Sequence, residues 1–155
     1  IVKSLPRVGL TFRMPVANCC DVTYLGRGDF ENYVDRAAGK IGIYETSPFA
    51  MFHYYVMPQS TGNRIDTRWL ALTGEKGSGW KIISDKPFRV LPYSDINIEA
   101  ATHINDLNFD GEVTVHVDAA QTGVGTATCG PGVLPVYWLP LESYEFDFTF
   151  IPVKE

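Results

Sequence analysis

Short runs of alternating apolar and polar residues recur along this chain. Three runs alternate most regularly: residues 7–15 (RVGLTFRMP), 112–118 (EVTVHVD) and 144–150 (YEFDFTF). Successive side chains of a β-strand point to opposite faces of a sheet, so a period of two predicts a strand with one buried face. We expect these three runs to form half-buried antiparallel strands.

Further apolar segments also predict strands. Residues 49–57 (FAMFHYYVM) are apolar on both faces, which is typical of a strand buried on both sides. Residues 68–74 and 80–84 flank the segment 75–79 (EKGSG), and this arrangement predicts a β-hairpin. The remaining predicted strands are residues 88–92 (FRVLP) and 133–139 (VLPVYWL).

Helical signals are few. Residues 94–107 begin with a capping residue at Ser94 or Asp95 and place four apolar residues at helical spacing. Those four are Ile96, Ala100, Ile104 and Leu107. Residues 31–39 predict a short helical turn that ends at Gly39. The chain is therefore expected to be all-β, an antiparallel β-sandwich with one or two short helices.

The composition suits one domain over residues 1–155. The chain has 155 residues, 45% of them hydrophobic, which is enough for one globular core. A net charge of −5 argues against nucleic acids and anionic membranes as partners. The apolar runs are shorter than the roughly 18 residues that a membrane helix needs. The chain begins inside a strand-like run without a secretory signal pattern, so we expect a fragment of a longer protein and assign no compartment.

The cysteines and histidines predict neither a disulfide framework nor a metal site. The three cysteines are Cys19, Cys20 and Cys129; neighbouring cysteines rarely bridge, and an odd count leaves one thiol free. Pairs with metal-ligand spacing are absent from the sequence, and the three histidines are far apart in it. We therefore expect no metal and no cofactor in this chain.

Residues 121–133 (QTGVGTATCGPGV) form the most unusual segment of the sequence. A dinucleotide fingerprint would need glycine where Thr128 stands, and Pro131 would break the helix that must follow. A phosphate loop would need a Gly-Lys-Ser/Thr ending that this segment lacks. Cys129 could act as a nucleophile only beside a base such as His103 or His116, which the sequence does not place near it. A flexible connection with a packed cysteine is the simpler interpretation.

Residues 57–69 (MPQSTGNRIDTRW) place many polar side chains between two apolar strands. Arg64, Asp66 and Arg68 alternate, so a strand here would carry a ladder of opposite charges on one face, next to Trp69. Planar polar groups beside an aromatic ring are typical of a sugar site, and a structural ion-pair network is the alternative.

Carboxylate pairs do not complete a catalytic set. Glu31 and Asp35, like Asp95 and Glu99, are four residues apart, a spacing at which such groups are more often solvated or paired with basic neighbours. A glycosidase needs two carboxyl groups that flank one bond, and an α/β-hydrolase needs a G-x-S-x-G elbow. We therefore assign no catalytic residue.

Four segments occur in an order that resembles a known family. They are residues 26–36 (GRGDFENYVDR), 57–69 (MPQSTGNRIDTRW), 100–107 (AATHINDL) and 115–137 (VHVDAAQTGVGTATCGPGVLPVY). Together they resemble the C-terminal domain (domain 5) of family 2 β-galactosidases, also called the β-galactosidase small chain, from about Leu5 to Pro152. The chain departs from the family pattern at Asp29, where proline is usual, and at Ser60-Thr61, where an acidic residue and an amide or serine are usual.

The resemblance implies a role in a larger enzyme. Such enzymes hydrolyse terminal β-galactosides with retention, through two glutamates on a (β/α)₈ barrel that lies outside this chain. Their C-terminal domain is a β-sandwich of galactose-mutarotase-like type (a supersandwich), and one of its loops reaches the rim of the active site. The matching loop here contains Thr128, Cys129 and Gly130, with Cys129 where well-known members carry a sugar-stacking tryptophan. A thiol offers less stacking area than an indole, so we expect weaker contact with the second sugar.

The leading hypothesis is a noncatalytic domain fragment of a β-galactosidase, inactive alone, whose partners are the remaining domains and a galactoside. Uncovered strand faces would favour self-association. A stand-alone carbohydrate-binding module with a site around Arg64, Asp66 and Trp69 is the alternative. A mutarotase-like enzyme is a third hypothesis, and it would need His103 or His116 to meet Glu31 or Asp118.

Overall fold

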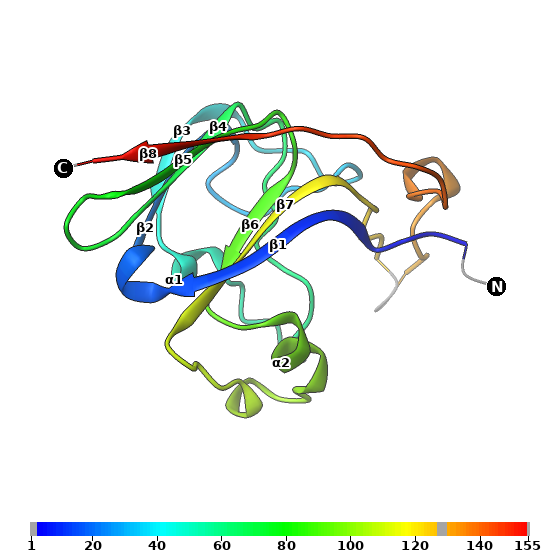
Figure 1. Ribbon diagram of the computed structural model, residues 1–155. Helices are drawn as coiled ribbons and strands as arrows, with labels where there is room; N and C mark the ends of the chain where they lie inside the picture. Colours follow the sequence, from blue (N-terminus) through cyan, green and yellow to red (C-terminus); the bar gives the residue numbers. More distant parts are fainter. Residues whose placement is uncertain (1–2, 127–129, 155) are drawn as a thin grey trace.

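Two antiparallel sheets face each other across one apolar core in the computed structural model, which describes residues 3–126 and 130–154 (Figure 1). The five-stranded sheet has the order β3-β2-β4-β5-β8, and the three-stranded sheet has the order β1-β7-β6. The strands are β1 (Arg7–Pro15), β2 (Asp21–Arg27), β3 (Ile41–Thr46), β4 (Trp69–Thr73), β5 (Gly79–Ile83), β6 (Phe88–Leu91), β7 (Glu112–Gln121) and β8 (Thr149–Val153).

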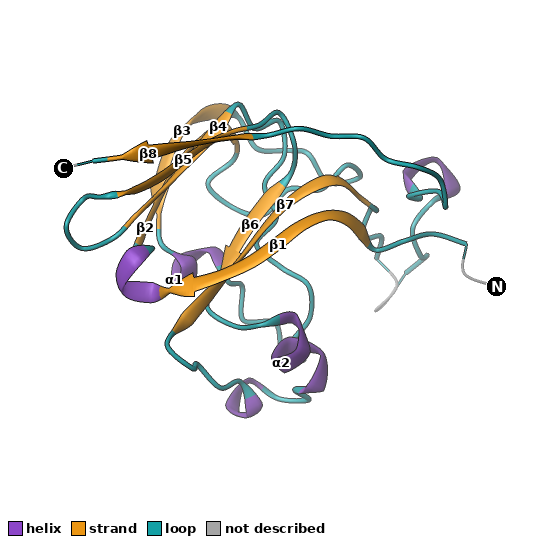
Figure 2. Cartoon of the chain, in the orientation of Figure 1, coloured by secondary structure: helices purple, strands orange, loops and turns teal. Residues whose placement is uncertain are grey.

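The helices of the described residues are short and lie outside the sheets (Figure 2). They are α1 (Pro48–Met51), α2 (Asp95–Ala100) and three 3₁₀ turns: η1 (Val16–Asn18), η2 (Ile104–Asp106) and η3 (Pro135–Tyr137). The prediction of an all-β sandwich with one or two short α-helices is confirmed.

The core forms where the apolar faces of the two sheets meet. Leu70 and Leu72 of β4 contribute from one sheet, and Val113, Val115 and Val117 of β7 from the other, all of them fully buried. Their spacing of two residues puts them on one face of each strand. Burying apolar surface in this way stabilises a fold by about 25 cal/mol per Å² removed from water.

Several predicted strands are present. The alternating run 7–15 is β1, the hairpin is β4 and β5, and residues 88–92 contain β6. The hairpin loop places Gly77 at a φ of 76°, a conformation that glycine adopts without steric cost.

Two predicted strands are wrong. Residues 49–57 begin in α1, because the Ser47 side chain caps the backbone N–H of Ala50 and Pro48 favours the first helical turn. Residues 133–139 contain η3, which Pro135 starts, and only Leu139 forms a bridge, to Leu5. Short apolar runs without strict alternation do not distinguish a strand from other buried segments.

The run 144–150 is also mostly wrong, since only its last two residues lie in β8. Tyr144, Phe146 and Phe148 are partly buried while Glu145 and Asp147 are exposed, as the alternation predicts, but Phe150 of the same predicted face is 37% exposed. The pairing of β8 with β5 begins at Thr149, opposite Ile83 at the end of β5, and residues 144–148 are not paired with any described strand.

Strand β7 differs from its prediction in burial. It was expected to be half-buried, but residues 113–118 are buried on both faces because β7 lies between β1 and β6 and its polar face is covered as well. Strands β2 and β3 were not predicted, although Val22, Tyr24, Ile41 and Ile43 follow a period of two.

The helical predictions were partly wrong. Residues 31–39 form a turn bridged between Tyr33 and Arg36 rather than a helix. Helix α2 is present with Ser94 as its cap, but it ends at Ala100, and it buries Ile98 while Ile96 is 83% exposed. The predicted apolar face was therefore the wrong one.

Candidate functional site

The Gly-rich segment 121–133 leaves the end of β7, and Asp35 holds its first part. The Asp35 carboxylate accepts hydrogen bonds from the backbone N–H groups of Val124 (3.1 Å) and Gly125 (2.8 Å). Gly125 adopts a φ of 59°, which turns two consecutive N–H groups toward one carboxylate. Charge-assisted bonds of this kind are stronger than neutral ones, so Asp35 fixes the direction in which the segment leaves the sheet.

The two sides of this segment are also joined. Gly123 N–H donates to the carbonyl of Tyr137 at 3.0 Å, and Thr126 N–H donates to the carbonyl of Pro131 at 3.0 Å. Thr128 and Cys129, two residues of the predicted sugar-contacting loop, lie outside the described residues, and Gly130 is exposed. The base of the loop is thus fixed, and the role of its tip stays a prediction.

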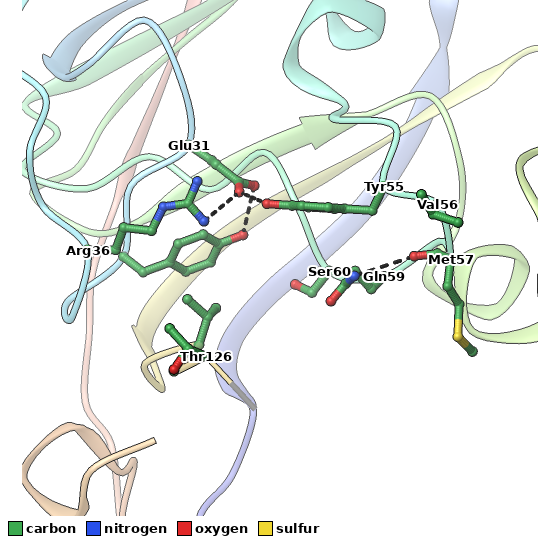
Figure 3. Close-up of a pocket in the computed structure, with 11 residues that line it drawn as sticks. Glu31, Arg36, Tyr55, Val56, Met57, Gln59, Ser60 and Thr126 are labelled. Carbon is green, nitrogen blue, oxygen red and sulfur yellow. Dashed lines mark hydrogen bonds and ion pairs between the residues drawn. The ribbon is translucent and has the colours of Figure 1, made fainter. Parts of the chain in front are cut away.

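A cleft of about 680 Å³ lies beside this base (Figure 3). Its walls come from residues 31–36, from residues 55–60 and from residues 124–126. In Figure 3, Tyr55 extends across the cleft toward Glu31, and Thr126 lies opposite. The lining combines an aromatic ring with amide, hydroxyl and guanidinium groups, a mixture that small polar ligands require.

Glu31 organises the wall of this cleft. Its carboxylate accepts hydrogen bonds from the hydroxyls of Tyr55, Tyr33 (3.2 Å) and Thr61 (2.9 Å) and from the N–H of Gly62 (3.0 Å). Arg36 adds an ion pair at 3.1 Å, as expected for one of the predicted basic partners. Burial opposes ionisation, but these donors outweigh it and lower the Glu31 pKa.

The ionised, fully bonded Glu31 acts as an anchor. It connects the turn at residues 31–36 to the segment that carries Tyr55, and the two cleft walls are held together in this way. Burial and the Glu31 carboxylate raise the Tyr55 pKa, so the phenol remains a hydrogen-bond donor at neutral pH. The ionised Glu31 carboxylate carries no proton that it could donate as a general acid.

The predicted charge ladder is not formed, because residues 64–68 are not part of a strand. Arg64 is 1% exposed, and its guanidinium donates to the Tyr24 hydroxyl and to the carbonyls of Gly62 and Asp29. These contacts tie the segment before β4 to β2 and to the segment that follows β2.

Asp66 and Trp69 lie in other surroundings. Asp66 has a φ of 52° and pairs with Arg27. Trp69 lies on β4, where the Lys81 ammonium group is 4.4 Å from the centre of its ring. The structure therefore gives Arg64, Asp66 and Trp69 three separate sets of neighbours, and their proposed contact with sugar stays a prediction.

The polar face of β7 carries a buried cluster that the sequence analysis did not assemble. His116 is fully buried, with Nδ1 2.9 Å from the Thr11 hydroxyl and Nε2 3.1 Å from Asp95. Burial and the nearby Arg89 charge lower the His116 pKa, against the effect of Asp95. Nε2 also lies 3.2 Å from Arg89 Nη2, so His116 contacts both members of the Arg89–Asp95 ion pair.

Asp95 and Asp118 behave differently within this cluster. Burial works against the Asp95 charge, but His116 and Arg89 outweigh it and lower its pKa to about 2. Burial dominates at Asp118 and raises its pKa, although Arg7 pairs with it at 3.0 Å. His116 and Asp118 thus share one face of β7, as the mutarotase-like hypothesis needs, but both are inaccessible to solvent.

Cysteine chemistry and metal binding have no support in residues 3–126 and 130–154. Cys19 is buried, and burial raises its pKa to about 12, which makes the thiol unreactive. These residues contain no group of three or more His, Cys, Asp or Glu that could hold a metal ion. Over the same ranges, a helix of the length and apolar character needed to span a bilayer is not found.

Known proteins match the chain over most of its length. Residues 2–150 match the family model described as β-galactosidase small chain. A β-galactosidase of Priestia megaterium is 36% identical over 127 residues, β-galactosidase BgaC of Bifidobacterium adolescentis is 33% identical over 129, and a β-galactosidase of Kluyveromyces lactis is 32% identical over 145. These matches cover 80%, 80% and 92% of this chain but only 12%, 12% and 14% of the relatives. The chain belongs to the β-galactosidase small-chain family.

Proposed function

We propose that this chain is a noncatalytic domain of a β-galactosidase and that its segment 121–133 contributes to the rim of the active site. The remaining domains of that enzyme are its partners, and they supply the catalytic glutamates that hydrolyse terminal β-galactosides. The family match supports this proposal, as do relatives that are β-galactosidases about seven to eight times longer than the matched region.

One observation carries the rim role. Asp35 binds two consecutive N–H groups at the base of the segment and so directs an otherwise glycine-rich chain away from β7. A loop that only connects two strands would not need a charged clamp. A loop that contacts substrate does, because misplacing a contact by 1 Å weakens binding and positioning.

The test uses the β-galactosidase polypeptide that contains this chain. In Asp35→Asn the side-chain amide can accept from one N–H but not from both, so the loop base loosens. We expect KM for a disaccharide to rise severalfold while kcat changes by less than about twofold, because uniform binding is lost. Asp147→Asn, at an exposed position, is the matched control. Equal KM values in both variants would refute the rim role.

Cys129→Trp tests the loop tip in the same polypeptide. An indole adds stacking area against a sugar, so we expect tighter binding of disaccharides. Unchanged affinity would show that the segment does not contact substrate. The isolated 155-residue chain is expected not to cleave a chromogenic galactoside, and activity that copurifies with it would contradict a noncatalytic role.

A stand-alone carbohydrate-binding module is the second candidate. It is favoured by the cleft between Tyr55 and Thr126, where an aromatic ring and several hydrogen-bonding groups converge. Calorimetric titration of the isolated chain with galactose and lactose distinguishes this module from a noncatalytic β-galactosidase domain. Saturable binding that Tyr55→Ala abolishes would favour the module.

A further inference from the structure

The polar ends of β1, β6 and β7 form a second cleft, of about 300 Å³, under the start of α2. Arg7 and Gln121 line it from β1 and β7, Arg89 from β6 and Asp95 from α2. It shares Ser60 and Val124 with the larger cleft of Figure 3, so the two adjoin. Neither the family match nor the predicted rim loop assigns a role to it.

Two arginines are held rigidly at this cleft. Arg89 pairs with Asp95 and donates to the Ser60 hydroxyl at 3.0 Å, while Arg7 donates to the same hydroxyl at 3.3 Å and pairs with Asp118. Arg89 is 2% exposed, so its guanidinium is fixed by its neighbours. Rigid, prepositioned donors lower the entropic cost of binding a ligand.

Two residues that line the cleft carry buried polar atoms without a partner. In the described part of the chain, Arg89 Nε and Gln121 Oε1 have no hydrogen-bond partner. An unpaired buried donor or acceptor costs about 1–3 kcal/mol, so such pairs of groups persist where a ligand or water completes them. One is a donor and the other an acceptor, and a hydroxyl group can serve both.

The charges of the cleft select against anions. The positive charges of Arg7 and Arg89 are balanced by Asp95 and Asp118, and Glu99 adds a further negative charge to the lining. An anion therefore meets no net positive field. Alternating donors and acceptors suit a neutral ligand with several hydroxyl groups. The volume lies at the lower end of the range for small-ligand pockets.

We propose that this cleft binds a neutral polyhydroxylated ring the size of one hexose. Arg7, Arg89 and Gln121 provide the contacts, with Ser60 at the boundary to the larger cleft. Gln121 and Val124 of this lining belong to the segment 121–133. The test below measures binding to the 155-residue chain, whereas the rim role is tested by KM in the larger enzyme, so the two proposals can fail separately.

The test is an NMR titration of the 155-residue chain with D-galactose, followed through the backbone amides. We expect saturable shifts at residues 7, 89, 121 and 122, with a dissociation constant in the millimolar range. Gln121→Leu removes the unpaired acceptor and is expected to weaken binding at least tenfold. Gln59→Leu is the matched control, because Gln59 lines the larger cleft only.

A second pair of variants keeps the test decisive if Gln121→Leu does not fold. Arg7→Gln should also weaken galactose binding, whereas Arg13→Gln, at the other end of β1 and paired with Asp110, should not. Thermal unfolding verifies that each variant is folded.

Three results would overturn the proposal. They are shifts confined to residues 55–57 and 125–126, displacement of galactose by sulfate, and no saturation up to about 100 mM galactose. The first would assign the sugar to the larger cleft, and the second would indicate an anion site.

Discussion

Glu31 and Asp118 are both buried carboxylates, yet their surroundings differ sharply. Glu31 accepts from four donors and pairs with Arg36, and its pKa is lowered. Asp118 pairs with Arg7, leaves Oδ1 without a partner in the described residues, and has a raised pKa. Burial alone therefore does not define a functional group; the number of donors around it decides.

This difference indicates that the region around Glu31 is a structural framework, whereas the cluster around Asp118 on β7 is a candidate site. The region around Glu31 is internally complete and joins segments that are distant in sequence, so removing its charge should affect folding. The cluster on β7 still has unpaired atoms and should respond to ligands and to pH. Four predictions test this distinction.

The largest effect is expected for Glu31→Gln. The new NH₂ group faces donors where the carboxylate had accepted, so several buried bonds are lost at once. We expect the free energy of unfolding to fall by about 3–4 kcal/mol, measured by urea denaturation. Glu75→Gln, in the exposed hairpin loop, should change it by less than about 0.5 kcal/mol. A loss below about 1 kcal/mol for Glu31→Gln would show that the framework role is wrong.

A smaller loss is expected for Ile98→Ala. Ile98 is 5% exposed and packs with Phe52 and Leu91, which holds α2 over the β7 cluster. Truncation should cost about 2–3 kcal/mol in the same denaturation experiment. Ile96→Ala, two residues away in the same helix but exposed, should cost less than about 0.5 kcal/mol. Equal losses of stability in the two variants would show that Ile96 also packs against the protein, as the sequence pattern predicts.

The cap of α2 should contribute less. The Ser94 hydroxyl accepts from the Asn97 N–H at 3.2 Å and so starts the helix that presents Asp95 to the cluster. Ser94→Ala is expected to lower the free energy of unfolding by about 1 kcal/mol. Ser78→Ala in the exposed hairpin serves as the reference. If both variants lose the same amount, the cap does not stabilise α2.

The smallest effect is a pH slope due to His116. Its folded pKa lies below the ordinary 6.5, so the unfolded chain binds this proton more readily. Stability from His116 is therefore complete above pH 6.5 and is lost as the pH falls toward the folded pKa. Asp95 affects stability only at lower pH, because its contribution to the free energy of unfolding is lost between about pH 3.8 and pH 2.

Urea midpoints measured between about pH 7 and pH 5 test this slope. The slope should decrease in His116→Gln and stay unchanged in His103→Gln, because His103 is exposed. Asp118 contributes a slope of opposite sign, since its pKa is raised, and the comparison of variants isolates the His116 part. An identical slope in all three proteins would contradict the buried, neutral state of His116.

The sequence by itself determined the elements whose signals are local. Strict alternation specified β1, the Gly-containing loop specified the β4–β5 hairpin, and Ser94 specified the start of α2. The ordered motifs also identified the family, which residues 2–150 match. Side-chain periodicity and capping depend on neighbours a few residues apart, so they can be read from the chain.

Tertiary structure decided the rest. Residues 144–148 keep an alternating pattern but form no strand, because the pairing of β8 with β5 begins only at Thr149. The sequence pattern predicts that Arg64 belongs to a charge ladder on one face of a strand, but Arg64 is buried, since the Tyr24 hydroxyl and loop carbonyls accept its donors. Asp35 clamps a loop about ninety residues later in the chain. These outcomes depend on which strand ends and loops meet in space, and that information lies in contacts between distant segments rather than in local patterns.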